Sequence, residues 1–408
     1  MQKGSMILQI SSNFIDSLTP SAIRYITTRI RADKKIGREI ITFAGGMPCS
    51  DFFPTEEELL QIFQSIMQNE GANALQYAAT DGYDPLREQI ALLVQRVNIQ
   101  TTYQNILVTA GSQQALNYIS RALIAPGDLV LCEDPTYVGA LDVFRSYTTN
   151  LIGVPMEDDG MDLSTLEEIL KSGARPRFLY TIPDFQNPTG RSMSVEKRKK
   201  LAELAKAYSL LIIEDAPYSL LAFDEPPRPA IKSFDTGDHV IYLGSFSKIV
   251  CPGLRVGYVI ADPESIGKLV YLKQRDDLQT DNLSQRLVCG YLRDFNFEDH
   301  LNVVRRAYRE RRDAMVAAIN ASFPAGVRCH PAGGGMFLWI ELPKHINARS
   351  VFDQVYEQGF AYVPGEFFYV AGDVHNTLRL NFCSFTPDEI AEKVQALGKV
   401  ISATLNVS

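Results

Sequence analysis

The sequence predicts an α/β fold in which helices cover a mostly parallel β-sheet and a smaller α+β domain follows. Three observations support this prediction. Short, almost wholly apolar runs recur between residues 104 and 262, stretches with the charge pattern of helices separate them, and the chain changes character after residue 281. A chain of 408 residues is also too long for one simple core, which favours two domains.

The apolar runs are each four or five residues long, which is typical of strands that are buried on both faces of a parallel sheet. Helical charge patterning lies between them, as in residues 194–208, and this alternation is typical of a layered α/β domain. The runs occupy residues 106–109, 129–132, 178–181, 210–213, 240–243 and 256–260.

The C-terminal part of the chain has a different pattern. Long helical patterns cover about residues 281–322, and residues 333–342 and 377–382 have the composition of strands. These features predict a small α+β domain on which the N-terminal segment packs. The predicted division is a large domain at residues 55–290, a small domain at 291–408 and an N-terminal segment at 1–54.

The composition argues against several classes of protein. A net charge of −8 disfavours a nucleic-acid surface. No apolar run reaches the roughly 20 residues that span a bilayer, and the N-terminus is a poor match to a signal peptide. The six cysteines form no CxxC pair and the five histidines have no ligand spacing. We therefore expect reduced thiols, no metal site, no membrane partner and a cytoplasmic protein.

Lys248 carries the strongest chemical signal in the chain. It ends the segment Gly244-Ser245-Phe246-Ser247-Lys248 after the fifth apolar run, and Arg255 follows seven residues later. The hydroxyls of Ser245 and Ser247 and the fork of Arg255 can bind a phosphate, while the lysine amine can bond to an aldehyde carbon. Pyridoxal 5′-phosphate (PLP) carries both groups. The alternative is a surface lysine in a Ser/Gly turn.

Loops after the first two strands suit the same cofactor, because ligands of an open parallel sheet bind at the carboxyl ends of its strands. Gly111, Ser112 and Gln113 open a helix whose free N–H groups can bind an anion. Tyr137 follows the second run and can lie flat on a heteroaromatic ring. Alone, these segments could equally be a glycine turn with a serine N-cap and a half-buried loop tyrosine.

An amide and a carboxylate follow the third and fourth strands. Asn187 is held extended by Pro188, and its amide can donate to a phenolate oxygen, which Tyr218 could share. Asp215 ends a nearly all-apolar strand, where an unpaired carboxylate is unfavourable and a protonated pyridine nitrogen would be a fitting partner. The alternatives are an Asn-Pro turn and a helix-capping or ion-paired aspartate.

Four motifs combine these residues: Asn187-Pro188-Thr189-Gly190, Asp215-Ala216-Pro217-Tyr218, Ser245-Phe246-Ser247-Lys248 with Pro252-Gly253-Leu254-Arg255-Val256-Gly257, and Leu378-Arg379-Leu380-Asn381-Phe382. In these four motifs, the chain resembles a fold-type I PLP enzyme of the class I/II aminotransferase family. Residues 43–48, 186–190 and 331–339 make it similar, more narrowly, to the kynurenine/2-aminoadipate aminotransferase subgroup. The resemblance covers nearly the whole chain and implies a central sheet of the seven-stranded type.

The resemblance also implies substrate contacts and a second subunit. Arg379 would hold the α-carboxylate of the substrate beside Asn187 and Gly46, and Arg24 matches a position that can touch the substrate. Tyr77 would reach the phosphate of the neighbouring subunit, so a homodimer with shared active sites is implied. Strand alternation alone instead makes Arg379 a solvated residue, on the face opposite its apolar neighbours.

Plain structural interpretations stay open for three residues. Arg24 could be an exposed helix arginine, and Tyr77 could be a core tyrosine. Asp184 puts a carboxylate near the expected substrate end of the site, but it could merely cap a turn.

We expect a PLP-dependent aminotransferase that moves the amino group of a 2-amino acid to a 2-oxo acid, with 2-oxoglutarate as the expected acceptor, by a ping-pong mechanism. Lys248 would act as general base while Asp215 holds the ring nitrogen charged. A PLP-dependent lyase or decarboxylase is one alternative. A non-catalytic effector-sensing domain is another, but it would need roughly 60–80 more N-terminal residues with a helix-turn-helix pattern.

Overall fold

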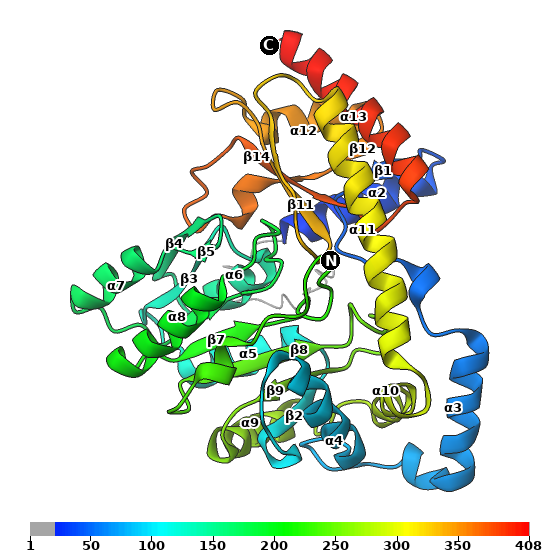
Figure 1. The fold of residues 1–408 in the computed structure, drawn as a ribbon, viewed down its shortest axis with the longest axis vertical. Coiled ribbons are helices and arrows are strands. Elements are labelled where there is room, and N and C mark those ends of the chain that lie inside the picture. The colour runs from blue at the N-terminus through cyan, green and yellow to red at the C-terminus, as the bar shows by residue number, and fades with distance from the viewer. Residues whose placement is uncertain (1–20, 408) are drawn as a thin grey trace, which may run out of the picture.

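The computed structural model describes residues 21–407. Within them, an eight-stranded sheet forms the centre of a larger part, and a four-stranded antiparallel sheet forms the centre of a smaller part (Figure 1). A separate pair joins β1 (Ile41–Thr42) to β12 (Phe360–Ala361) in parallel. This pair connects the N-terminal part of the chain to the smaller part.

The larger sheet has the predicted mostly parallel architecture. In spatial order its strands are β2 (Ile106–Thr109), β9 (Gly257–Ile260), β8 (Val240–Ser245), β7 (Ile212–Asp215), β6 (Leu179–Thr181), β3 (Val130–Asp134), β4 (Leu151–Glu157) and β5 (Gly160–Met161). β8, β7, β6, β3 and β4 are parallel, β9 is antiparallel to both of its neighbours, and β5 is antiparallel to β4. Without the two-residue β5, the described sheet has the seven strands that the resemblance implies.

All six predicted apolar runs form strands, with ends shifted by up to two residues. The strand β4, which lies next to the edge of the sheet, was not predicted from the sequence. Its residues are mostly part-exposed or exposed, and Gly153 and Pro155 interrupt its apolar pattern. Glycine and proline are typical of strands at such positions, where fewer ladder bonds and less burial are required.

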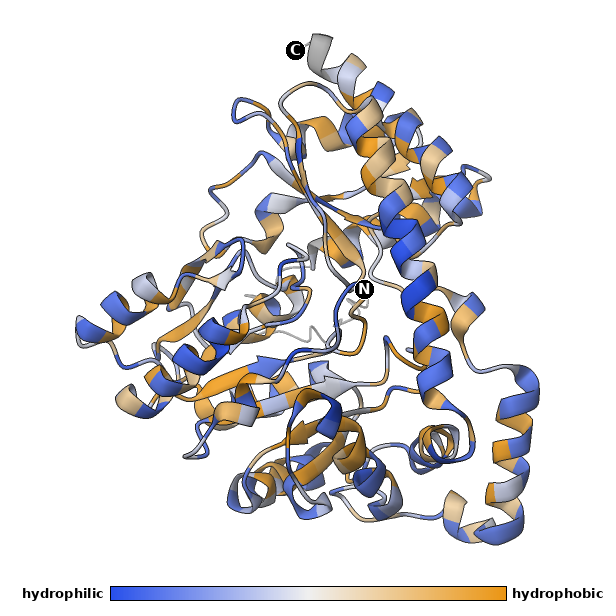
Figure 2. Cartoon of the chain, in the orientation of Figure 1, coloured by the Kyte–Doolittle hydropathy of each residue, from blue (hydrophilic) through white to orange (hydrophobic). Residues whose placement is uncertain are grey.

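Helices cover both faces of the larger sheet. They are α4 (Asp84–Leu93), α5 (Ser112–Leu123), α6 (Val138–Arg145), α7 (Leu163–Lys171), α8 (Val195–Tyr208) and α9 (Pro263–Asp276), while α10 (Asn282–Asp294) packs on α4 and α3 (Glu56–Asn69) packs on α10. Because strand residues alternate between faces, Leu131, Leu179 and Ile212 pack with α7 and α8, while Cys132 and Tyr180 share the core of α5 and α6. Figure 2 shows apolar residues gathered on the central strands and polar residues on the outer helix faces.

The smaller part packs its sheet under three helices. Its strands are β10 (Arg328–His330), β11 (Phe337–Glu341), β14 (Thr377–Asn381) and β13 (Val363–Pro364), and its helices are α11 (Phe297–Ser322), α12 (Ala348–Glu357) and α13 (Pro387–Val407). α11 runs from beside α10 to α13, along which it packs (Figure 1). One long helix therefore connects the two parts.

The helix α2 (Ala22–Lys35) lies against the smaller part. Arg29 pairs with Asp353 at 2.9 Å, and the hydroxyl of Tyr356 donates to Asp33 Oδ2 at 2.7 Å. Both partners are on α12. The division at residues 55–290 and 291–408, with a separate segment at 1–54, stays a prediction. Residues 21–407 contain no helix that has both the length and the apolar character of a membrane crossing.

Candidate active site

Lys248 lies three residues beyond the carboxyl end of β8, at the same edge of the sheet as the end of β7. Its Nζ donates to the carbonyl oxygen of Gly46 at 2.7 Å, so the structure brings Lys248 and Gly46 together. Burial lowers the pKa of Lys248 to about 8, and the charges of Arg379 and Arg255 act in the same direction. A substantial fraction of this amine is therefore neutral, and nucleophilic, near pH 8.

The predicted phosphate-binding residues form one cradle beside Lys248. Arg255 donates to the Ser247 hydroxyl at 3.4 Å and to the Ala110 carbonyl at 3.1 Å, and the hydroxyls of Ser245 and Ser247 are 3.0 Å apart. Gly111 has a φ of +85°, and a Cβ there would lie 2.7 Å from an Arg255 nitrogen. Only glycine fits this approach without strain.

The first turn of α5 completes the cradle. The helix starts at Ser112, and no side chain caps its N-terminus. Its free N–H groups and the Arg255 guanidinium therefore combine in a site for a dianion. Gln113 is also close, but it turns toward α6, where it donates to the carbonyl of Gly139 at 2.9 Å and accepts from the Tyr137 hydroxyl at 3.3 Å.

Asp215 ends β7 and is almost fully buried. Its Oδ2 accepts a hydrogen bond from the Tyr180 hydroxyl at 2.8 Å, whereas Oδ1 is buried without a partner among the described residues. Burial raises the pKa of Asp215 to about 6, and the Tyr180 hydrogen bond opposes that shift. A buried carboxylate oxygen without a donor is unfavourable, so this atom fits a ligand that brings a cationic N–H.

Tyr218 and Tyr137 border the space between these groups. Both are strongly buried at the phenol, and burial raises the pKa of each. The charges of Asp215 and Arg379 act on both phenols, which is a sign of their closeness. The Tyr218 ring meets Phe337 edge to face, with 6.0 Å between centroids. The structure thus brings both tyrosines to the same edge of the sheet as Asp215.

Arg379 corrects the expectation from strand alternation. It is only 1% exposed, although it lies opposite the faces of Leu378 and Leu380. The side of β14 that strand alternation leaves open to solvent is covered by Phe337, whose ring centroid lies 4.1 Å from the guanidinium carbon, and by Phe368 at 5.1 Å. Strand alternation cannot predict that cover, because the two aromatic residues come from other segments.

The Arg379 guanidinium is partly satisfied by the protein. It donates to Asn187 Oδ1 at 2.7 Å and to the Ala44 carbonyl at 2.9 Å, while its buried Nε has no partner among the described residues. Burial lowers the pKa of Arg379 to about 10, so it stays a cation at neutral pH. A buried cation without a carboxylate partner fits an anionic ligand.

Two predicted residues lie at the surface. Tyr77 is 78% exposed, which excludes the core tyrosine that was left open. Arg24 is exposed on α2, and its charge lowers the pKa of Tyr137 against the larger effect of burial. Arg24 therefore lies within electrostatic reach of the site, whereas the described residues give Tyr77 no contact with it.

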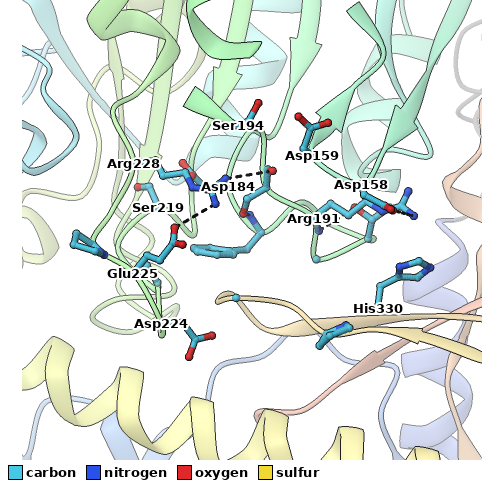
Figure 3. A pocket seen from close by; sticks show the side chains of 18 residues that line it. Asp158, Asp159, Asp184, Arg191, Ser194, Ser219, Asp224, Glu225, Arg228 and His330 are labelled. Atoms are coloured by element: carbon cyan, nitrogen blue, oxygen red, sulfur yellow. Dashed lines mark hydrogen bonds and ion pairs between the residues drawn. The ribbon is translucent and has the colours of Figure 1, made fainter. Parts of the chain in front are cut away.

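Asp184 does not belong to the site. It forms a buried ion pair with Arg198 at 2.5 Å. It also lines a cavity of about 470 Å³ that includes Phe185, Arg191 and Glu225 and none of the predicted site residues. Figure 3 shows the side chain of Asp184 in that cavity. Its carboxylate is thus already matched by a cation and carries no information about the substrate.

Two residues that support the site, Tyr180 and Glu133, were not predicted from the sequence. Tyr180 donates to Asp215, and Glu133 accepts from Thr181 at 2.5 Å and from Gln186 at 3.0 Å, which anchors the loop before Asn187. Burial raises the pKa of Glu133 to about 7. Polar residues inside otherwise apolar strands were the available signal, because such groups need partners. No metal-binding group of three or more acidic, His or Cys side chains occurs among residues 21–407.

The sequence matches the family model "Aminotransferase class I and II" over residues 43–397. The chain belongs to this aminotransferase family. It is 40% identical over 368 residues to aromatic-amino-acid aminotransferase 1 of Thermococcus litoralis, covering 89% of this chain and 88% of that one. It is 41% identical over 369 residues to 2-aminoadipate transaminase of Thermus thermophilus, covering 90% and 91%.

A solved structure of an aminotransferase of the same family agrees with the fold. Kynurenine aminotransferase of Pyrococcus horikoshii, in complex with PMP, superposes with a TM-score of 0.91 at 38% identity and covers 97% of this chain and 98% of that one. The aminotransferase is therefore an enzyme of the kynurenine/2-aminoadipate subgroup, and PLP-dependent transfer of an amino group from amino acids is its reaction. The expected class of enzyme and its cofactor are confirmed.

Proposed function

We propose that the residues at the carboxyl edge of the larger sheet bind PLP, each contacting a different group of the cofactor. Lys248 would bond to the aldehyde carbon, Asp215 Oδ1 would accept from the ring nitrogen, and Tyr137 would lie against the ring. Asn187 and Tyr218 donate to the phenolate oxygen. The phosphate is held by Gly111, Ser112, Gln113, Ser245, Ser247 and Arg255, and by Tyr77 of a second copy of the chain. The observation that carries this assignment is the unpartnered, buried Oδ1 of Asp215 beside Lys248 and the cationic cradle.

The protein groups then determine the course of the reaction. PLP, when bound, supplies an aldehyde that reacts with amines and a protonated ring that withdraws electrons from the substrate Cα. Arg379 binds the α-carboxylate and thereby fixes the direction of the Cα–H bond. The Lys248 amine would act as the general base that accepts and moves the Cα proton of the substrate. Its lowered pKa supports this role, because a base must be neutral before it can accept a proton.

We propose a 2-amino acid with an acidic or aromatic side chain as donor and 2-oxoglutarate as acceptor, in a ping-pong cycle. The support comes from Arg24, whose cationic side chain is within electrostatic reach of Tyr137 at the site, and from relatives that act on aromatic amino acids and 2-aminoadipate. Gly46 lies beside Lys248 and leaves room for the substrate, since its nearest neighbour, Phe337, would be 3.6 Å from an added Cβ.

A homodimer with shared sites is proposed as well. The strongly exposed large apolar residues of the described chain include Met47 (66%), Leu75 (70%), Tyr77 (78%) and Leu278 (53%). Gln279 accepts a hydrogen bond from the backbone of Ala78, so the last three belong to segments that touch. Apolar surface of this kind supports contact with another protein chain.

The cysteines of the described chain support an assignment to the cytoplasm. All six, which include the part-buried Cys49, Cys251 and Cys329, are unpaired. Secreted proteins of oxidising compartments usually pair their cysteines. We therefore propose a cytoplasmic enzyme that contacts small acids and its own second copy, without nucleic acid.

Substitution of Lys248 tests the proposed function. Lys248→Ala removes both the covalent attachment and the general base, so transamination of an amino-acid panel should fall by at least about 10²–10⁴-fold. The pH-dependent absorbance of the lysine-bound cofactor should also be absent from the purified protein. Lys268→Ala is the matched control, because Lys268 is exposed and pairs only with Glu264 on its own helix. Full activity of Lys248→Ala would exclude the proposed role.

A further inference from the structure

The two oxygens of the Asp215 carboxylate have unequal surroundings. Oδ2 accepts from the Tyr180 hydroxyl at 2.8 Å, and Oδ1 is buried and has no partner within residues 21–407. Tyr180 is the one donor that the described residues offer to this carboxyl group, since the next backbone N–H, of Ala216, donates to Leu243. The protein therefore holds one oxygen and leaves the other for a ligand.

The sheet register brings Tyr180 to this position. β6 and β7 are parallel neighbours, and Tyr180 is opposite Ile213. Since strand residues alternate, the side chains of Ile213 and Asp215 lie on one face, and Tyr180 shares that face. The tyrosine is thus one strand away and two residues behind the carboxylate, a span that a phenol bridges and a serine or threonine does not.

The Tyr180 ring has little freedom to turn away. It is 0% exposed, and it packs edge to face against Phe144 with 5.4 Å between centroids and 73° between ring planes. Phe144 packs in turn against Phe178 in the same manner, at 5.3 Å. Close packing of this kind fixes the direction of the hydroxyl, because rotation would require several buried rings to move.

We propose that Tyr180 is a positioning residue that keeps Asp215 ionised and directs its free Oδ1 at the ring nitrogen of bound PLP. This inference rests on the proposed role of Asp215 and adds a residue that acts through it. A hydrogen bond to the charged form of an acid favours that form, whereas burial disfavours it. Tyr180 stays a donor at any ordinary pH, because burial and the neighbouring Asp215 raise its own pKa well above 10.

Loss of the Tyr180 hydroxyl should therefore alter the ionisation of Asp215 and leave the fold intact. In Tyr180→Phe the ring and its packing against Phe144 remain, but both carboxylate oxygens lack a protein donor. The ionised form then becomes less favourable, and so does the pairing with a protonated ring. The expected results are a rise of about one pH unit in the titration midpoint of Asp215 and about tenfold weaker PLP binding.

The experiment compares three single variants by two measurements. The Asp215 midpoint is read in the apoprotein by carboxyl-¹³C aspartate NMR, with Asp215→Asn identifying the signal, and the PLP dissociation constant is measured by fluorescence. Tyr362→Phe is the matched control, because Tyr362 is fully buried and its hydroxyl donates to the Ala348 carbonyl at 2.7 Å, away from Asp215. It should change neither quantity.

A second substitution keeps the test decisive if Tyr180→Phe does not fold. Site-specific 3-fluorotyrosine at position 180 retains the hydroxyl and makes it more acidic, so the Asp215 midpoint should move down instead of up. An unchanged midpoint in both variants overturns the inference. If Asp215→Asn also binds PLP and turns over normally, the proposed role of Asp215 fails too; if only Asp215→Asn is impaired, the role of Tyr180 alone fails.

Discussion

Burial changes the chemistry of the Lys248 amine, for which we propose the role of general base. Burial lowers its pKa to about 8, and its Nζ keeps a single hydrogen bond to Gly46. Desolvation disfavours the charged form of a lysine, so the neutral base becomes available at a pH where surface lysines are fully protonated. The pH dependence of lysine reactivity should therefore separate Lys248 from the other lysines.

In the apoprotein, we expect acylation of Lys248 to rise about tenfold per pH unit up to about pH 8 and then to level off. The direction follows from the reactive species: below the pKa the charged amine predominates, and above it nearly all molecules carry the neutral one. Peptide mass spectrometry of samples labelled between about pH 6 and about pH 11 measures this. Lys268, exposed on α9, is the internal control and should rise across the whole range.

A shared titration curve for Lys248 and Lys268 would contradict the prediction.

Arg379 shows which properties of a site residue can be predicted from sequence. A sequence motif pointed to Arg379 as a candidate site residue. Its burial could not be predicted, because the rings of Phe337 and Phe368 that cover it are distant in sequence. The partners of Asp215 were hidden for the same reason, since Tyr180 is 35 residues away. Residue types were predictable, and contacts between strands were not.

At the scale of elements, we propose that α2 influences substrate choice. It is anchored to α12 through Arg29 and Asp353. Burial raises the pKa of Asp142 on α6, and a hydrogen bond with Ser21, at the N-cap of α2, opposes that shift. Arg24 is thereby held between the two parts, near Tyr137. A cation at this position suits a side-chain carboxylate of the substrate.

Arg24→Gln should therefore lower kcat/KM for 2-aminoadipate by about 10–100-fold, because a charge-assisted hydrogen bond is lost. The value for phenylalanine should stay within about twofold, as its side chain brings no charge to the site. Steady-state kinetics on both amino acids measure the ratio. Arg31→Gln, an exposed arginine on the same helix, should leave both values unchanged. Equal losses for both substrates would remove Arg24 from specificity.

The element pattern was largely predictable where strands are apolar and central. The six runs became strands, and the loops after five of them carry the candidate site. β4 escaped prediction because a strand near the sheet edge needs less apolar sequence, and short strands such as β1 and β12 have too few residues for a pattern.

At the scale of the whole molecule, the proposed homodimer predicts that Tyr77 of one chain completes the site of the other. Mixing two inactive variants, Lys248→Ala and Tyr77→Ala, tests shared sites directly. In a mixed dimer, one site would combine an intact Lys248 with an intact Tyr77, so unfolding and refolding the mixture should restore about a quarter of full activity. Each variant refolded alone is the control. A mixture that stays as inactive as its components would show that each site is built by one chain.

Two backbone carbonyls of one short segment, at Ala44 and Gly46, accept hydrogen bonds from the candidate site residues Arg379 and Lys248. The Gly46 carbonyl accepts from Lys248 and the Ala44 carbonyl from Arg379. The Phe43 N–H donates to the carbonyl of Ala361 on β12, and the Phe43 carbonyl accepts from the Asn381 N–H. This backbone thus ties the lysine of the larger part to the arginine of the smaller part. A displacement of this backbone at Ala44 should also displace Gly46. Binding of the substrate carboxylate at Arg379 should therefore be coupled to release of the Lys248 amine from Gly46.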